Sequence, residues 1–143
     1  MNFEKIILSL PKAIQGWAYK EMEKKRESWE QLSFVYWMEE QGLKFTAIPN
    51  STWTTSWMQK FKNHALGLRK GLLDLIIVIP AEKLDIASPR TIFIEMKRVK
   101  GGSVSKAQKE WIRDLNDSGI DAYVCKGADE AIKVVESYFS KNL

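Results

Sequence analysis

The alternation of apolar and polar positions predicts a chain of helices and strands. Residues 2–10 are predicted to form a short helix that ends at Pro11, and a longer helical stretch is predicted over residues 12–41, before a break at Gly42. Within this stretch, one side of the helix is polar at its start and apolar at its end, so it is expected to enter the core. That side carries Glu27, Glu30, Gln31, Phe34 and Met38.

Four segments rich in β-branched and apolar residues are predicted to be strands. They are residues 44–48, 74–79, 91–97 and 122–125. Only a polar loop separates the second from the third, so these two are expected to form a central hairpin. Further helices are predicted over residues 55–66, over a stretch capped by Ser103 or Ser105, and from about Asp129 onward. The resulting order, αβ(α)ββαβα, indicates an α/β (α+β) fold in which a central mixed sheet is flanked by helices.

Length and composition fit a single globular unit. The chain has 143 residues, of which 45% are hydrophobic and 28% charged, close to the averages for soluble globular proteins. The longest purely apolar run, residues 75–79, is far shorter than the roughly 20 residues that cross a bilayer, and no signal-peptide pattern is present. We therefore expect a cytoplasmic protein with no membrane partner. The single cysteine, Cys125, lies in an apolar run and is expected to be a buried thiol without a catalytic role.

The N-terminal segment is predicted to be an addition to the main domain. Residues 1–25 form a helical extension in this interpretation, and residues 26–143 form the domain proper. The extension carries more apolar residues than the core requires, and exposed apolar patches often mark interfaces. They are Ile6, Ile7, Leu10, Ile14 and Trp17. The sequence thus predicts a homodimer contact in the extension.

Positive charge gathers in two clusters that flank a few acidic residues. Lys and Arg number 22 against 18 Asp and Glu, and the net charge of +4 is compatible with a polyanionic partner without requiring one. One cluster comprises Lys60, Lys62, His64, Arg69 and Lys70, and the other Lys97, Arg98, Lys100, Lys106 and Lys109. Either cluster alone is also typical of a solvated surface.

Acidic residues and a lysine are predicted to meet at the ends of the two central strands. Glu95 and Lys97 project from one face because side chains alternate across a strand, and Asp74 opens the neighbouring strand. Two carboxylates offer the hard oxygen ligands that suit Mg²⁺, with Mn²⁺ as a substitute. The lysine can hold a water molecule or a phosphate oxygen, and Gln108 in the next helix can orient the same water. The alternative is a surface salt bridge beside an ordinary hairpin.

Two tryptophans stand near the first basic cluster. Trp53 and Trp57 can be interpreted as platforms on which unpaired bases stack, but packing in the core is favoured because aromatic residues at this spacing more often pack. His64 is expected to be a surface or phosphate-contacting residue with no role in catalysis.

Three motifs together point to a known family. They are Gly71-Leu-Leu-Asp74-Leu75, Phe93-Ile-Glu95-Met-Lys97-Arg98-Val-Lys-Gly101-Gly102 and Ser105-Lys-Ala-Gln108-Lys-Glu-Trp111. With these motifs the chain resembles stand-alone, phage-type members of the VRR-NUC family, which belongs to the PD-(D/E)xK superfamily. The resemblance runs from about Glu27 to Phe139, and Leu73 stands where the family usually has proline. It implies a restriction-endonuclease-like core.

The resemblance also implies roles for individual residues. Asp74, Glu95, the backbone carbonyl of Met96 and an N-terminal helical glutamate would bind the metal. Lys97 would position or activate water, and Gln108 would complete the site. Glu27 is preferred as the helical glutamate because Gln31 follows it by four residues, and Glu30 is the alternative. The predicted DNA contacts are Asn50, Arg69, Lys70, Arg98, Lys100 and Lys106.

The main functional hypothesis is a Mg²⁺- or Mn²⁺-dependent deoxyribonuclease of replication, recombination or repair. It is expected to act as a homodimer on branched DNA such as four-way junctions. Exonuclease or flap-nuclease action on the same fold is an alternative. A non-catalytic DNA-binding module is another alternative, although carboxylates aimed into basic clusters repel phosphate unless a cation intervenes.

Overall fold

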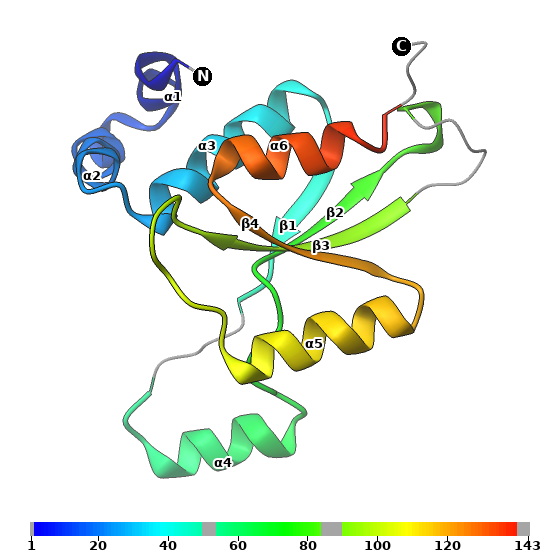
Figure 1. Ribbon diagram of the computed structural model, residues 1–143. Helices are drawn as coiled ribbons and strands as arrows, with labels where there is room; N and C mark the ends of the chain where they lie inside the picture. Colours follow the sequence, from blue (N-terminus) through cyan, green and yellow to red (C-terminus); the bar gives the residue numbers. More distant parts are fainter. Residues whose placement is uncertain (1, 50–53, 84–89, 140–143) are drawn as a thin grey trace.

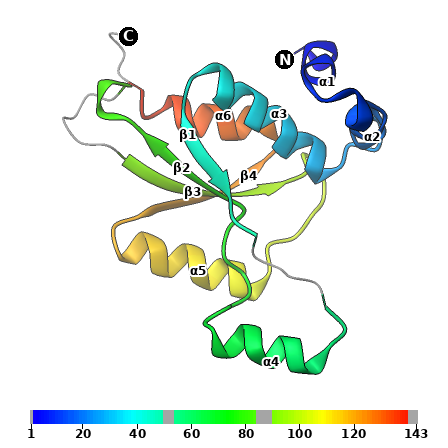
Figure 2. The same ribbon diagram turned by 180° about the vertical axis from the view of Figure 1, so that it is seen from behind.

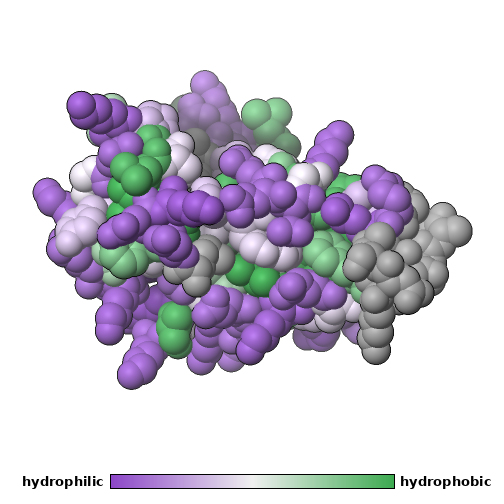
Figure 3. Space-filling view, turned by 90° about the horizontal axis from the view of Figure 1, so that it is seen from above, coloured by the Kyte–Doolittle hydropathy of each residue, from purple (hydrophilic) through white to green (hydrophobic). Residues whose placement is uncertain are grey.

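A four-stranded sheet with helices on both faces forms the body of the protein. The computed structural model describes residues 2–49, 54–83 and 90–139. Two helices, α3 and α6, cover one face of the sheet, and α5 covers the other (Figures 1 and 2). Seen from the α3 and α6 side, the surface is mostly hydrophilic with isolated apolar side chains (Figure 3). In the described part of the chain, no helix is long and apolar enough to cross a membrane.

The strands lie in sequence order, and the sheet is mixed as predicted. They are β1 (Lys44–Ala47), β2 (Leu75–Ile79), β3 (Arg90–Lys97) and β4 (Asp121–Lys126). The first three strands pair antiparallel, which confirms the central hairpin, and β4 joins β3 in parallel. The parallel pair requires a crossover, which α5 supplies. Leu75 pairs with Ile94, and this register brings Asp74 beside Glu95.

The core lies between the sheet and the α3 and α6 layer. Alternate residues of the central strands point into it and are fully buried: Leu75, Ile77, Ile79, Ile92, Ile94 and Met96. Phe34 and Met38 enter from α3, as the helical pattern predicted. Cys125 joins this cluster as a buried thiol, and burial raises its pKa to about 12. Because every second strand residue faces this core, the intervening positions of β3 face α5 and carry the polar residues of the site.

The long helical stretch predicted over residues 12–41 is in fact two helices. The N-terminal helices are α1 (Phe3–Ser9), α2 (Lys12–Glu23) and α3 (Glu27–Glu40). After α2, Lys25 adopts a left-handed φ of 51°, its N–H donates to Met22, and the Arg26 N–H donates to Glu21. This is a Schellman ending, in which glycine is usual at the position of Lys25. The break was not predicted because a lysine, and not a glycine, occupies that position.

The remaining helices follow the predicted order, with one exception in packing. They are α4 (Trp57–Ala65), α5 (Lys106–Asp117) and α6 (Ala128–Glu136), and a short 3-10 turn, η1, spans Ala81–Lys83. Ser105 caps α5, which settles the choice between the two predicted serines. The favoured interpretation of Trp57 as a core residue is wrong, because 71% of its surface is exposed on α4. Trp53 lies outside the described residues.

Candidate active site

Asp74 and Glu95 hold each other in place at the ends of adjacent strands. The backbone N–H of Asp74 donates to Oε2 of Glu95 over 3.1 Å, and the N–H of Met96 donates to Oδ2 of Asp74 over 2.8 Å. Each carboxylate thus accepts a hydrogen bond from the backbone of the neighbouring strand. The two side chains are positioned by the sheet itself, and little conformational freedom remains to be lost when a ligand binds.

Lys97 and Gln108 converge on the second carboxylate. Nζ of Lys97 lies 3.1 Å from Oε1 of Glu95, and both side chains are almost completely buried. The amide of Gln108 donates to the same oxygen, while its carbonyl accepts from the backbone N–H of Ser105. Gln108 therefore forms half of the capping box of α5 and also ties that helix to the strand. The structure brings together the three residues predicted from β3 and α5.

Glu27 completes an acidic cluster drawn from three elements. It is the first residue of α3, and one oxygen each from Glu27, Asp74 and Glu95 lie within 4.8 Å of one another. Three carboxylate oxygens at this spacing are the hard ligands that Mg²⁺ or Mn²⁺ prefers, and several waters usually complete such a coordination shell. The donor set therefore fits a small divalent cation.

Burial and mutual repulsion raise the pKa values of two of these carboxyls. The pKa of Glu95 rises from 4.5 to about 7, mainly through burial and next through the charge of Asp74, against the opposing effect of Lys97. Burial also raises the pKa of Glu27. Ionising all three groups without a counter-charge is thus unfavourable, and a divalent cation would relieve that cost.

Cation binding is consequently expected to tighten as the pH rises towards and past about 7. The raised pKa of Glu95 favours the protonated form in the folded protein, so its contribution to stability is present below pH 4.5 and is lost as pH rises through about 7. A cation binds the ionised form and displaces that proton. Titration with Mn²⁺ between about pH 5.5 and 8 measures this effect, and Glu95→Gln should remove most of the slope. An affinity independent of pH across this range would contradict it.

Glu30, the alternative to Glu27, lies elsewhere. Its Oε1 accepts from the backbone N–H of Ala128 over 3.2 Å, at the first turn of α6. A carboxylate at a helix N-terminus compensates the helix dipole and an unsatisfied N–H group. The side chain of Glu30 therefore links α3 to α6 and is not one of the three clustered carboxylates.

The predicted DNA contacts fall into separate groups. Lys70 and Lys106 line a single cavity of about 410 Å³ beside the start of α5. Arg98 and Lys100 line another of about 420 Å³ at the α2–α3 junction. That second cavity also involves Lys24, Lys25 and Trp29, which were not predicted from the sequence, although the basic run at residues 24–26 was the available signal.

Two further predicted contacts have other outcomes. Nη1 of Arg69 donates to the backbone carbonyls of His64 and Leu68, each over 2.9 Å, so this side chain closes the end of α4. Asn50 lies outside the described residues.

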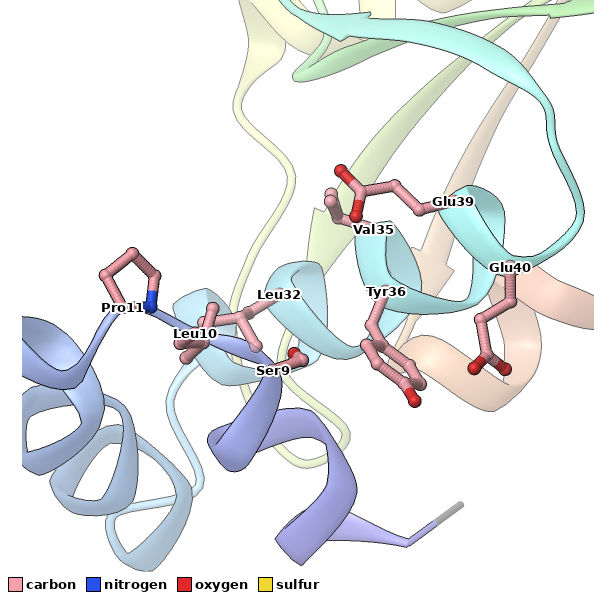
Figure 4. Close-up of a pocket in the computed structure, with 8 residues that line it drawn as sticks. All are labelled: Ser9, Leu10, Pro11, Leu32, Val35, Tyr36, Glu39 and Glu40. Carbon is pink, nitrogen blue, oxygen red and sulfur yellow. The ribbon is translucent and has the colours of Figure 1, made fainter.

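One cavity among the described residues lies away from the acidic site. It holds about 450 Å³ between the α1–α2 turn and the outer surface of α3 (Figure 4). Leu10 and Pro11 form one wall, and Leu32, Val35 and Tyr36 form the other. None of the three clustered carboxylates lines this cavity.

The fold and the acidic site together define a domain of the restriction-endonuclease-like class, with a mixed sheet carrying a carboxylate pair and a lysine at its end. The VRR-NUC domain model matches residues 11–129, and the chain belongs to this family. A solved structure described as a VRR_NUC domain protein is similar over 79% of this chain and 87% of its own, with 27% identity and a TM-score of 0.61. No curated protein sequence matches the chain. Membership of this family indicates a nuclease-type function in DNA processing.

Proposed function

We propose that the protein is a Mg²⁺-dependent deoxyribonuclease, in which Mn²⁺ can substitute, and that it hydrolyses phosphodiester bonds at the cluster of Glu27, Asp74 and Glu95. The observation that carries the proposal is the convergence of three carboxylates from three elements beside the buried ammonium of Lys97. A structural salt bridge needs one carboxylate, and two more placed beside it repel one another unless a cation lies between them.

The carboxylates, Lys97 and Gln108 are proposed to have different roles in hydrolysis. A divalent cation held by the carboxylates would supply positive charge that favours ionisation of a nearby water and offsets charge developing on the phosphate. The backbone carbonyl of Met96 is proposed as a further ligand. Lys97, held by its ion pair with Glu95, positions the attacking water or a phosphate oxygen. Gln108 fixes the orientation of Glu95 and can contact the same water.

Two pairs of basic residues are proposed to hold the DNA backbone. Lys70 and Lys106 line the cavity beside the start of α5, and Arg98 and Lys100 line the cavity at the α2–α3 junction. Positive charge of this kind attracts any DNA regardless of sequence, and its strength falls with salt. A non-catalytic DNA-binding module would share these cations but has no use for three adjacent carboxylates.

Cleavage of a panel of labelled DNAs tests the proposal. Linear duplex, single-stranded, flapped and four-way junction substrates are incubated with Mg²⁺, with Mn²⁺ and with EDTA. We expect DNA cleavage products only in the presence of a divalent cation. Binding without cleavage of any substrate would favour the non-catalytic module, and products confined to ends or flaps would favour exonuclease or flap-nuclease action.

Glu27→Gln is expected to impair cleavage more than Glu30→Gln. Glu27 contributes a carboxylate oxygen to the cluster. Glu27→Gln removes this charged ligand while keeping the shape of the side chain. Glu30→Gln instead changes a contact to the first turn of α6 and should act mainly on stability. Single-turnover cleavage rates and thermal unfolding of both variants separate the two effects. The reverse ranking of cleavage rates would transfer the metal role to Glu30.

We further propose that two copies act together on branched DNA in recombination or repair. A domain of this length has a radius of gyration of about 15 Å, and its described residues form one acidic cluster. Symmetric cutting of two strands is therefore more simply done by a two-fold dimer. In the proposed extension, residues 1–25, Ile6 packs inward, but Ile14 and Trp17 are 40% and 47% exposed and offer contact surface. Light scattering at micromolar concentration tests this. A monomer that degrades linear ends faster than junctions would overturn it.

A further inference from the structure

Helix α4 stands apart from the rest of the domain and exposes its apolar side chains. It lies beyond α5, on the side of the sheet away from α3 and α6 (Figures 1 and 2). No residue of the helix is buried. Trp57 is 71% exposed, Met58 64% and Phe61 65%. Helical steps of 100° place these three side chains within one third of the helix circumference, so they form one apolar stripe.

The segment that contains α4 accounts for the net positive charge of the chain. Residues 41–73 contain five Lys or Arg and no Asp or Glu, whereas the other 110 residues contain 17 basic and 18 acidic residues. The net charge of +4 therefore comes from this segment, since the rest of the chain sums to −1. On α4 itself, Lys60 and Lys62 flank the apolar stripe from opposite sides. Charge complementarity thus favours a polyanion over a neutral or basic protein surface.

Aromatic rings and cations are interleaved on this helix. The rings of Trp57 and Phe61 are 6.4 Å apart with an interplanar angle of 36°, and Nζ of Lys60 lies 5.0 Å from the centre of the Trp57 ring. Exposed rings beside ammonium groups are the pattern by which proteins bind single-stranded nucleic acid, since bases stack on the rings while the cations follow the phosphates. Duplex DNA keeps its bases stacked on one another, so it offers these rings no partner of this kind.

The connection between α4 and the acidic cluster is short and tightly held. Arg69 closes the end of α4, and the indole N–H of Trp111 on α5 donates to the carbonyl of Lys70 over 3.1 Å. Gly71 then packs directly on Ala107, and Asp74 follows three residues later. A strand bound on α4 would therefore lie on a fixed path relative to the cluster.

We infer that the Trp57, Met58 and Phe61 face of α4, with Lys60 and Lys62, is a binding surface for unpaired nucleotides of the DNA substrate. This inference rests on the proposed function and specifies its substrate: DNA with a single-stranded or unstacked segment next to the bond that is cut. The face contributes to the choice of substrate and takes no part in the chemistry, because its side chains belong to a helix separate from the carboxylate cluster.

The test measures DNA binding without metal, so that no cleavage takes place. Affinities of the wild type and of Trp57→Ala are measured in EDTA by fluorescence anisotropy, with a labelled single-stranded oligonucleotide and with a blunt duplex of the same length. Tyr19→Ala, which removes a half-exposed aromatic side chain from α2, is the matched control. A second pair compares Lys60→Ala/Lys62→Ala with Lys5→Ala/Lys12→Ala, at exposed lysines on α1 and α2. Light scattering and thermal unfolding are recorded for each variant.

We expect Trp57→Ala to weaken single-strand binding by about fivefold or more and duplex binding by less than about twofold, because loss of one stacking platform costs only the unstacked bases. The Lys60/Lys62 pair should weaken both DNAs and lower the salt dependence. Tyr19→Ala should change the affinity for neither DNA. The inference would be overturned if Trp57→Ala left the affinity for both DNAs unchanged or weakened it equally for both. It would also be overturned if Trp57→Ala converted a dimer to a monomer, because a second copy of the chain would then be the occupant of this face. Because binding is measured without metal, these results stand apart from any failure of cleavage.

Discussion

Asp74→Ala, Glu95→Ala and Lys97→Ala are each expected to reduce metal-dependent DNA cleavage by about 10³-fold or more. When residues act as one catalytic unit, removing any one of them removes most of the activity. Asp74 and Glu95 supply two of the three clustered oxygens, and Lys97 supplies the only ammonium seen to pair with that cluster in the described part of the chain. Their loss removes charge from the point where phosphate charge develops. Single-turnover rates on the substrate that the wild type cuts fastest measure this effect.

Matched variants separate chemistry from folding. Asp74→Asn keeps an oxygen that can accept from the Met96 N–H, and Glu95→Gln keeps a neutral group of the same shape beside Lys97. Both should remain folded and inactive. In EDTA they should bind DNA at least as tightly as the wild type, because each removes a negative charge near phosphate. Full activity in any one of these variants would refute the assignment.

Gly71→Ala is expected to lower both stability and cleavage. A Cβ at this position would lie 2.6 Å from the Cβ of Ala107 and 2.8 Å from its carbonyl carbon, and the φ of Gly71 is +94°. The turn would have to move away from the start of α5. This movement would separate Asp74 from Gln108 and from Glu95, to which Gln108 donates a hydrogen bond. Overpacking typically costs about 1–3 kcal/mol, and an unfavourable φ adds about 1–3 kcal/mol.

Gly67→Ala provides the control for that prediction. Gly67 has a similar φ of +102°, but nothing lies within 4 Å of the position its Cβ would take. It should therefore show the backbone cost alone, with cleavage close to that of the wild type. Urea unfolding and cleavage rates of both variants give the comparison. Equal losses in the two would show that the contact between Gly71 and Ala107 does not position the site.

Much of the site was accessible from the sequence because strands have a strict period of two. That period placed Glu95 and Lys97 on one face, and the run of apolar residues after Asp74 indicated the neighbouring strand. The hairpin and the mixed sheet followed from the same pattern and are confirmed by the pairing of β2 with β3 and of β3 with β4. Local periodicity was sufficient here because the site lies on adjacent strands.

Other features depend on contacts between distant segments and could not be predicted in this way. Glu27 and Glu30 are three residues apart on one helix, and only the position of α6 shows that Glu30 meets Ala128. The ending of α2 at Lys25 carries no glycine to mark it. Trp57 has the spacing typical of a packed aromatic residue, yet it is 71% exposed and no residue of α4 is buried. Each of these outcomes is decided by tertiary packing and not by local pattern.

The position of bound Mn²⁺, found by anomalous scattering from a crystal grown with the ion, tests the central claim most directly. We expect one strong peak within about 2.0–2.4 Å of oxygens from Asp74 and Glu95, with Glu27 in direct or water-mediated contact, and loss of that peak in Asp74→Asn. A crystal saturated with Mn²⁺ that shows no peak at these carboxylates, or a peak only at another surface site, would contradict it.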